Sequence, residues 1–203
     1  MLDTGILALR GFPIETAAEA ILEGGARILQ MRHKTEFTRD TLAVAKRIAG
    51  LCHRAGALFV VNDRADIALL TGAALHLGQD DLPVDAARKL LGSVRAIGLS
   101  IHNESQLREA ADAPADYVAL GPLFSTGTKH NPDPVVGLVE FARLRALSRR
   151  PLVAIGGITR HNAMQAIAAG ADSLAIAAGL YPEDMSKRSL RGRTEEWEQL
   201  LKN

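Results

Sequence analysis

A single (β/α)8 barrel is the fold that this sequence predicts, and three observations lead to it. Short apolar runs alternate with helical patterns along the whole chain, which is typical of repeated β-α units around a parallel sheet. Eight such units can be counted. The length of 203 residues is near the lower limit of roughly 200 for a complete barrel. We therefore predict one domain over residues 1–203.

The predicted strands are mostly continuous apolar runs, as burial on both faces of a sheet requires. In chain order they cover residues 6–10, 26–32, 58–63, 74–79, 95–102, 117–122, 152–158 and 173–180. The first is the weakest, because it is short and close to the N-terminus. Without it the sheet would be open and doubly wound, which is the alternative fold.

Apolar residues recur at helical spacing between the predicted strands. One stripe runs through residues 14–22 and another through residues 138–147, so each segment offers one apolar face to a sheet. Asn103 followed by Gln106 resembles a capping box at a helix start, and Gly170 stands where a helix is expected to stop. We expect the helices to form a layer outside the strands.

The charge balance excludes several classes of partner. Lys plus Arg number 24 and Asp plus Glu number 23, so no global field would hold nucleic acid or an anionic membrane. No apolar run approaches the ~20 residues that span a bilayer, and the N-terminal segment lacks the features of a signal peptide. These features predict a cytoplasmic protein without nucleic-acid or membrane partners, whose basic chemistry is local.

Several common kinds of active site are absent from the sequence. The single cysteine, Cys52, falls on an apolar stripe, where free cysteine acts as a small hydrophobe. The six histidines show no spacing typical of a transition-metal site. The glycine motifs of serine hydrolases, P-loop enzymes and Rossmann dehydrogenases do not occur either.

Two cations stand at the end of the second predicted strand, where barrels carry their functional side chains. That strand ends in Gln30, Met31, Arg32, His33 and Lys34. Strand alternation puts Arg32 and Lys34 on the same side as Gln30, so both cations are expected at the barrel mouth. The alternative is a solvated strand end, because Arg and Lys are mostly exposed.

Carboxylates follow the next two predicted strands at the same end of the sheet. Asn62 and Asp63 end the third strand, and Asp80 and Asp81 follow the fourth. Magnesium is usually held by one or two carboxylates together with phosphate oxygens and water. Asp63 and Asp81 beside Arg32 therefore predict a diphosphate site with magnesium. The alternative for Asp80 or Asp81 is capping of the next helix.

The remaining strand ends offer groups that suit a second anion. Ser100 ends the apolar part of the fifth strand and can donate a hydroxyl hydrogen bond. Residues 125–129 form a hydroxyl-rich turn with a lysine, in a loop over 124–136 that is long enough to be a lid. Gly156 and Gly157 would let backbone N–H groups approach a phosphate. An ordinary flexible turn and glycines needed for a tight turn are the alternatives.

Six segments in order resemble the thiamin phosphate synthase family. They are QMRHK at 30–34, VNDRADIALL at 61–70, LHLGQDDLP at 75–83, GLS at 98–100, GPLFSTGTK at 121–129 and AIGGIT at 154–159. The third and fifth segments are the specific ones, whereas an IGGI strand end occurs in many phosphate-binding barrels. Together the matches span seven of the eight predicted repeats.

The resemblance implies a transferase of thiamine biosynthesis that joins a pyrimidine diphosphate to a thiazole phosphate in a dissociative step. It implies Mg2+ as cofactor, held by Asp63 and Asp81. The catalytic residues it implies are Arg32, Lys34, Ser100 and Lys129. The pyrimidine diphosphate would contact Gln30, Met31, Arg32, His33, Lys34, Asn62, Ser100 and Lys129. The thiazole phosphate would contact Thr126, Gly127, Thr128, Gly157, Ala177 and Ala178.

The chain departs from the family pattern at three places, and two other functions compete with the synthase. His33 stands where Glu is common and Ala178 where Ser is common, and the first strand lacks the usual aromatic and threonine pattern. A related thiazole tautomerase would lack the GQDD acids and carry His in place of Pro122. A non-catalytic phosphate-ligand sensor would not need both acids and Lys129. A homo-oligomer is compatible with the sequence.

Overall fold

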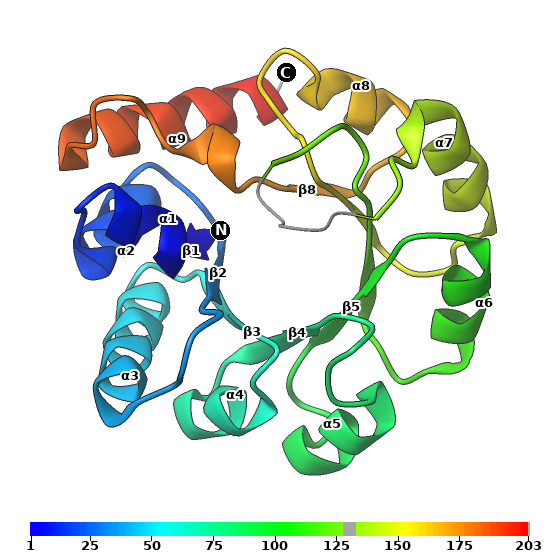
Figure 1. Ribbon diagram of the computed structural model, residues 1–203, viewed down its shortest axis with the longest axis horizontal. Coiled ribbons are helices and arrows are strands. Elements are labelled where there is room, and N and C mark those ends of the chain that lie inside the picture. The colour runs from blue at the N-terminus through cyan, green and yellow to red at the C-terminus, as the bar shows by residue number, and fades with distance from the viewer. Residues whose placement is uncertain (128–132, 203) are drawn as a thin grey trace. The chain divides into compact units, whose positions relative to one another are not determined.

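Helices and strands alternate along the chain in a computed structural model that describes residues 1–127 and 133–202 (Figure 1). Its strands are β1 (Leu2–Asp3), β2 (Ile28–Arg32), β3 (Leu58–Asn62), β4 (Ala74–Leu77), β5 (Ile97–Ile101), β6 (Tyr117–Leu120), β7 (Leu152–Ile155) and β8 (Ser173–Ala175). Its helices are α1 (Thr4–Leu9), α2 (Ile14–Glu23), α3 (Arg39–Arg54), α4 (Ala65–Thr71), α5 (Val84–Leu91), α6 (Glu104–Asp112), α7 (Gly137–Leu147), α8 (Ala163–Ala168), the 3-10 helix η1 (Ala178–Leu180) and α9 (Lys187–Lys202). This is the alternation that the sequence predicts.

The chain folds as two compact units. The first unit is Met1–Leu75 together with Leu180–Asn203, and the second is His76–Gly179. The boundary falls inside β4, so that strand gives residues to both units. The prediction of a single domain stays a prediction.

The strands of the first unit place three polar residues at one edge. β1 pairs with β2 and β2 with β3, both in parallel, with Asp3 opposite Arg32 and Met31 opposite Val61. Continuing this register puts Asn62 level with Arg32, because successive residues of paired strands advance together. Asp3, Arg32 and Asn62 therefore lie at the carboxyl ends of neighbouring strands.

Helices cover the strands of the first unit with apolar faces. α2 packs against both α3 and α9 (Figure 1). The predicted apolar stripe of α3 is buried, including Ile48 and Cys52, and Trp197 of α9 is only 2% exposed. Burial raises the pKa of the Cys52 thiol to about 11, so this side chain stays a neutral hydrophobe, as the sequence predicts.

The second unit repeats the same arrangement. Strands β5 to β8 pair in parallel in chain order. Gly98 of β5 lies opposite Tyr117 of β6, Ala119 of β6 opposite Val153 of β7, and Ala154 of β7 opposite Leu174 of β8. Each helix between these strands buries one face. On α7, for example, the Phe141 side chain is 0% exposed. The carboxyl ends of these strands consequently share one edge.

The first predicted strand is wrong. Residues 6–10 lie in and just after α1, and the strand before them has only two residues, Leu2 and Asp3. The side chain of Asp3 accepts hydrogen bonds from the backbone N–H groups of Gly5 and Ile6, at 3.0 and 3.1 Å. This N-cap starts a helix that a short apolar run by itself does not distinguish from a strand.

The other boundaries differ by smaller amounts. The last predicted strand is too long, because β8 ends at Ala175 and residues 178–180 form η1. Asn103 is the N-cap of α6 and accepts from the backbone of Gln106 at 3.0 Å, as predicted. The Gln106 side chain accepts from the backbone N–H of His102, one residue before the cap. Gly170 follows α8 with φ at 98°, as a helix stop requires.

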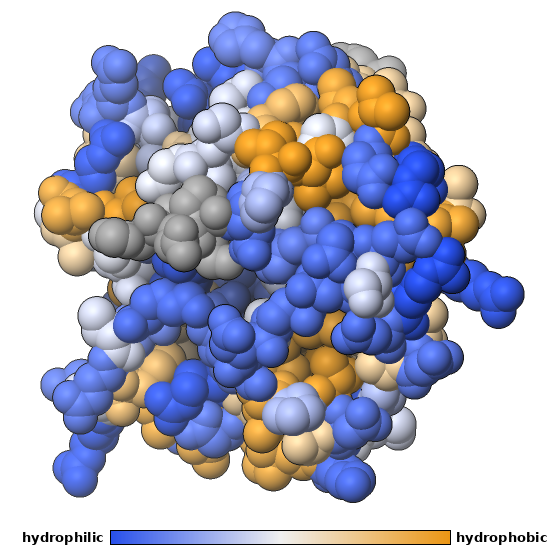
Figure 2. Space-filling model, turned by 45° about the vertical axis from the view of Figure 1, so that its right-hand side comes forward, coloured by the Kyte–Doolittle hydropathy of each residue, from blue (hydrophilic) through white to orange (hydrophobic). Residues whose placement is uncertain are grey.

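The surface shows no large apolar face in the view of Figure 2. Hydrophilic residues cover most of that face, and apolar residues gather in separate patches. Large apolar side chains that are exposed include Leu9, Val94 and Val139, which is normal for single residues. Over the described residues, no helix has both the length and the apolar composition that crossing a membrane requires.

Candidate active site

The two cations at the end of β2 are held by carboxylates of the first unit. Arg32 Nη1 lies 2.6 Å from Asp3 Oδ2, and the Arg32 side chain is 23% exposed. Lys34 forms an ion pair with Asp63. Asp3 itself is 4% exposed and was not among the predicted residues. This ion pair fixes the Arg32 guanidinium, whose remaining N–H donors can bind an anion.

Asp63 has an unusual backbone at the end of β3. Its φ is 67°, and within the described ranges no other non-glycine residue has a positive φ. The N–H of Arg64 donates to the carbonyl of Asn62 at 2.8 Å, closing a three-residue turn with Asp63 at its centre. Such turns are rare and strained, and strain of this kind occurs at functional positions. The role of the Asp63 carboxylate stays a prediction.

The remaining predicted residues of the β2 segment have different surroundings. Gln30 is half-buried, whereas the Met31 side chain is only 2% exposed and belongs to the core. His33 is fixed on both ring nitrogens, by the Thr4 hydroxyl at 2.9 Å and by the carbonyl of Glu36 at 3.1 Å. His33 consequently orders the start of α1 and the loop after β2.

Asp81 in the second unit is not a helix cap. Its Oδ2 accepts from the backbone N–H of Gly78 at 2.6 Å, whereas the N-cap position of α5 is Pro83. The side-chain nitrogen of Gln79 donates to the carbonyl of Ser100 at 2.5 Å. The capping alternative for Asp81 is therefore wrong, and the acid instead closes the turn after β4.

Ser100 has a partner that sequence reasoning did not find. Its hydroxyl lies 2.9 Å from Nε2 of His76, a residue of β4 that is 5% exposed. The signal that histidines give in a sequence is metal-ligand spacing, and a single buried histidine gives no such signal. This contact fixes the position of the Ser100 hydroxyl oxygen.

The glycine pair after β7 is required by packing. Gly156 and Gly157 both have positive φ, at 90° and 67°. A Cβ atom on Gly157 would lie 2.5 Å from the carbonyl oxygen of Ser125, and one on Gly156 would lie 2.6 Å from Pro122. The alternative that these glycines are structural is thus supported, because the segment after β6 packs directly on them. A phosphate contact at Gly157 stays a prediction.

The other residues predicted for the thiazole phosphate lie after β6 and β8. Thr126 is half-buried and Gly127 exposed, while Thr128 and Lys129 lie outside the described residues. Ala177 and Ala178 come directly after β8, where η1 begins. The predicted lid over 124–136 includes the undescribed residues 128–132. Farther along this loop, Asp133 Oδ2 lies 3.3 Å from Nε2 of His102.

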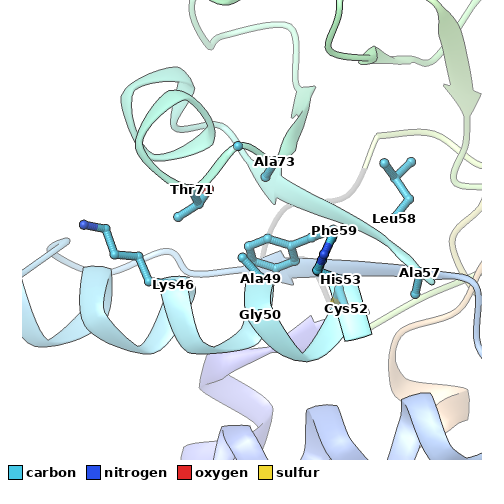
Figure 3. A pocket seen from close by; sticks show the side chains of 11 residues that line it. Lys46, Ala49, Gly50, Cys52, His53, Ala57, Leu58, Phe59, Thr71 and Ala73 are labelled. Carbon is cyan, nitrogen blue, oxygen red and sulfur yellow. The ribbon is translucent and has the colours of Figure 1, made fainter. Parts of the chain in front are cut away.

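One pocket of the first unit lies away from these strand ends. It is bordered by α3, the start of β3 and the end of α4, and Figure 3 shows the ring of Phe59 beside α3 with Lys46 at the far end. Ala57 and Leu58, which line it, precede or begin β3, whereas Asp63 follows that strand. Functional sites of barrels occupy the carboxyl ends of strands, so this pocket is not the candidate site.

No ready-made metal cage exists within residues 1–127 and 133–202, where three or more His, Cys, Asp or Glu side chains do not gather. Asp63 belongs to the first unit and Asp81 to the second. A site that uses one or two carboxylates plus substrate oxygens needs no such cage. The donor chemistry of the two acids fits magnesium in that mode.

Comparison with known proteins identifies the family. The family model described as thiamine monophosphate synthase matches residues 8–180. The chain belongs to the thiamine monophosphate synthase family. A thiamine-phosphate synthase from Chlorobium phaeovibrioides is 47% identical over 165 residues, which cover 81% of this chain and 79% of that protein. One from Methanoculleus marisnigri is 43% identical over 188 residues, which cover 91% and 89%.

A solved structure extends the likeness to the fold. The thiamine phosphate pyrophosphorylase from Pyrococcus furiosus is 32% identical, with a TM-score of 0.84, and the match covers 96% of this chain and 92% of that one. The fold class is therefore the predicted (β/α)8 barrel. Membership of the thiamine monophosphate synthase family makes the chain an enzyme of thiamine biosynthesis and a transferase, as the ordered motifs predicted.

Proposed function

We propose that this family member joins 4-amino-2-methyl-5-hydroxymethylpyrimidine diphosphate to a thiazole phosphate, giving thiamin phosphate and diphosphate. The observation that carries the proposal is the constellation in the first unit. Arg32 is fixed by buried Asp3, and Lys34 is paired with Asp63, whose backbone is strained. Two oriented cations and an acid at neighbouring strand ends suit a diphosphate. The synthases that the chain matches by sequence support the same reaction.

The residues present suit a dissociative substitution. The bond between the pyrimidine methylene carbon and the diphosphate oxygen breaks, and its electron pair leaves with the diphosphate. The aminopyrimidine stabilises the resulting cation, and the thiazole nitrogen uses its lone pair to form the new carbon–nitrogen bond. Arg32 and Lys34 would stabilise the negative charge that develops on the leaving group. The step needs no protein general base, because no proton is transferred.

Magnesium is part of the proposal. Asp63 and Asp81 would hold it, and when bound it would neutralise diphosphate charge as a Lewis acid. The pairing of Asp63 with Lys34 supports this assignment, since it shows that this carboxylate accepts a cation. A metal bound at Asp63 would leave Lys34 to pair with the diphosphate.

The partners in this proposal are small molecules, and the location proposed is the cytoplasm. The second unit would supply the contacts to the thiazole phosphate, from the segment after β6, Gly157, and the alanines at η1. The family and sequence matches are to thiamine phosphate synthases. They support neither of the alternatives considered from sequence, a thiazole tautomerase and a non-catalytic sensor.

Product formation by the purified protein tests the reaction. Thiamin phosphate is measured from the two substrates with magnesium and then with excess chelator, for the wild type and for Asp63→Asn. Asparagine tolerates positive φ, so this variant keeps the backbone and removes the charge. We expect at least about a hundredfold loss, because several kcal/mol of charge stabilisation is lost and about 1.4 kcal/mol corresponds to tenfold.

Asp66→Asn is the matched control. Asp66 lies in the first turn of α4 and pairs with Arg64 at 2.5 Å, and the Arg64 side chain holds the pKa of Asp66 below its usual range. This exposed pair is outside the proposed site, so Asp66→Asn should keep wild-type activity. Absence of product from the wild type would overturn the reaction. Chelator-insensitive turnover, or full activity of Asp63→Asn, would overturn only the metal assignment.

A further inference from the structure

Three side chains of the second unit form a chain of hydrogen bonds that ends at Ser100. The Tyr117 hydroxyl on β6 lies 2.9 Å from Nδ1 of His76, and Nε2 of His76 lies 2.9 Å from the Ser100 hydroxyl. The imidazole is 5% exposed. Ser100 is thus connected through a buried ring to a phenol on another strand.

The position of Tyr117 is set by packing against a glycine. Gly98 and Tyr117 are paired residues of β5 and β6. A Cβ atom at Gly98 would lie 2.0 Å from Cζ of the Tyr117 ring, so the ring occupies the space that any other side chain would fill. The His76 and Tyr117 rings are also tilted against each other, with centroids 5.5 Å apart. Close packing of this kind holds the phenol oxygen at the imidazole.

The phenol favours one direction for these hydrogen bonds. Burial raises the pKa of Tyr117 well above its ordinary value, so the hydroxyl keeps its proton. Within the described part of the chain, the partner of that hydroxyl is His76 Nδ1. A phenol that donates to Nδ1 leaves a neutral imidazole with its proton on Nε2, because one ring nitrogen accepts while the other donates.

The Nε2–H group then donates to the oxygen of Ser100. A hydroxyl oxygen that accepts one bond still has its own hydrogen to donate. In the opposite tautomer the serine would donate to Nε2 and turn only lone pairs toward its surroundings. A diphosphate offers only acceptors, so the first arrangement attracts it and the second does not.

We propose that Tyr117 and His76 are positioning residues that keep the imidazole proton on Nε2 and thereby direct the Ser100 hydroxyl hydrogen toward an anionic substrate. The proposal rests on the proposed function in one respect, because the contact between Ser100 and the pyrimidine diphosphate belongs to that function. The direction of the hydrogen bonds does not depend on the reaction. The two parts therefore have separate tests.

The tautomer is read by nitrogen NMR on protein labelled at its six histidines. The His76 signals are identified as those that His76→Gln removes. We expect the wild type to show the Nε2–H tautomer and Tyr117→Phe to lose that preference, since the donor to Nδ1 is gone while the ring stays packed on Gly98. A wild-type imidazole protonated on Nδ1, or on both nitrogens at neutral pH, would overturn the relay.

A double-mutant cycle tests whether the relay acts through Ser100. Tyr117→Phe should lower kcat about tenfold in the wild-type background, as expected for one lost hydrogen bond to a charged group. The same change should have no effect in Ser100→Ala, where no hydroxyl remains to be directed. An equal loss in both backgrounds would mean that Tyr117 serves packing alone.

The outcomes separate this inference from the proposed function. A wild type that forms no thiamin phosphate overturns the function and, with it, the substrate contact of Ser100. The NMR spectrum then still decides the direction of the hydrogen bonds. Unfolding temperatures of all variants distinguish a lost relay from a lost fold, because a folded Tyr117→Phe variant with altered tautomer and reduced kcat supports the inference.

Discussion

At the scale of single residues, Asp3 connects the start of the chain to the candidate site. Its Oδ1 caps α1 through Gly5 and Ile6, and its Oδ2 holds Arg32 at 2.6 Å. Its backbone N–H donates to the Tyr181 hydroxyl at 3.0 Å. One carboxylate therefore serves both the local structure and the orientation of a predicted catalytic cation.

Two substitutions at Asp3 separate these roles. Asp3→Asn keeps a cap acceptor and removes the charge that Arg32 faces, at an expected cost of about 2 kcal/mol for a hydrogen bond to a charged group. Asp3→Ala removes the cap as well and should cost about 1 kcal/mol more. Denaturant unfolding measures both, and KM for the pyrimidine diphosphate should rise in each. Equal stability of the two variants would contradict the capping role.

The residue scale also shows where prediction from sequence succeeds and fails. Alternation along the second strand predicts Arg32 and Lys34 on one side, and the structure gives each of them an acidic partner, Asp3 and Asp63. The partner of Arg32 was missed because Asp3 is 29 residues away in the chain. Pairing across that separation depends on strand register, which no local pattern of residues encodes.

At the scale of elements, α1 shows the limit of hydrophobic pattern. Residues 6–9 are apolar and led to the predicted strand over 6–10, yet an N-cap at Asp3 starts a helix that ends at Leu9. The cap and the apolar run are both visible in the sequence, but the run is too short to show whether its period is that of a strand or of a helix. Longer segments such as α2 and α7 were predicted correctly because several turns repeat the same period.

Contact between α2 and α9 yields a prediction on packing. A Cβ atom on Gly24, which follows α2, would lie 2.5 Å from Cβ of Thr194 in α9 and 2.9 Å from the Arg191 carbonyl. Gly24→Ala should therefore destabilise the fold by about 1–3 kcal/mol through overpacking. Thermal or denaturant unfolding measures the change.

Gly50→Ala is the matched control for that substitution. Gly50 lies inside α3, and its nearest neighbour for an added Cβ is Arg54 Nη1 at 3.5 Å, an ordinary contact. Alanine should stabilise this helix by about 0.5–1 kcal/mol, because glycine loses more backbone entropy on folding. Equal effects of the two changes would contradict tight packing of α9 on Gly24.

At the scale of the whole molecule, charge is balanced and anion binding must come from local groups. The formal net charge is +1 at pH 7, so the protein has no general attraction for anions. Specific binding to the folded state should then raise the unfolding temperature. Free inorganic phosphate, which lacks the pyrimidine, should have a much smaller effect.

A thermal-shift experiment measures this rise in unfolding temperature. The pyrimidine diphosphate with magnesium, at about 100 times its Kd, should add about 2.7 kcal/mol of stability, or roughly 5–10 °C for a chain of this size. The shift should shrink in Asp63→Asn. An equal shift with free phosphate would indicate general anion binding, and would count against a site built for the diphosphate substrate.

The sequence by itself determined the alternation of strands and helices over most of the chain, and the family, because each depends on local periodicity or on ordered motifs. Tertiary structure alone decided which side chains meet. Ser100 and His76 are 24 residues apart, and His76 and Tyr117 are 41 apart. Such contacts follow from the register of neighbouring strands and from glycines that leave room for a ring. Neither register nor free space is encoded in any single segment of the chain.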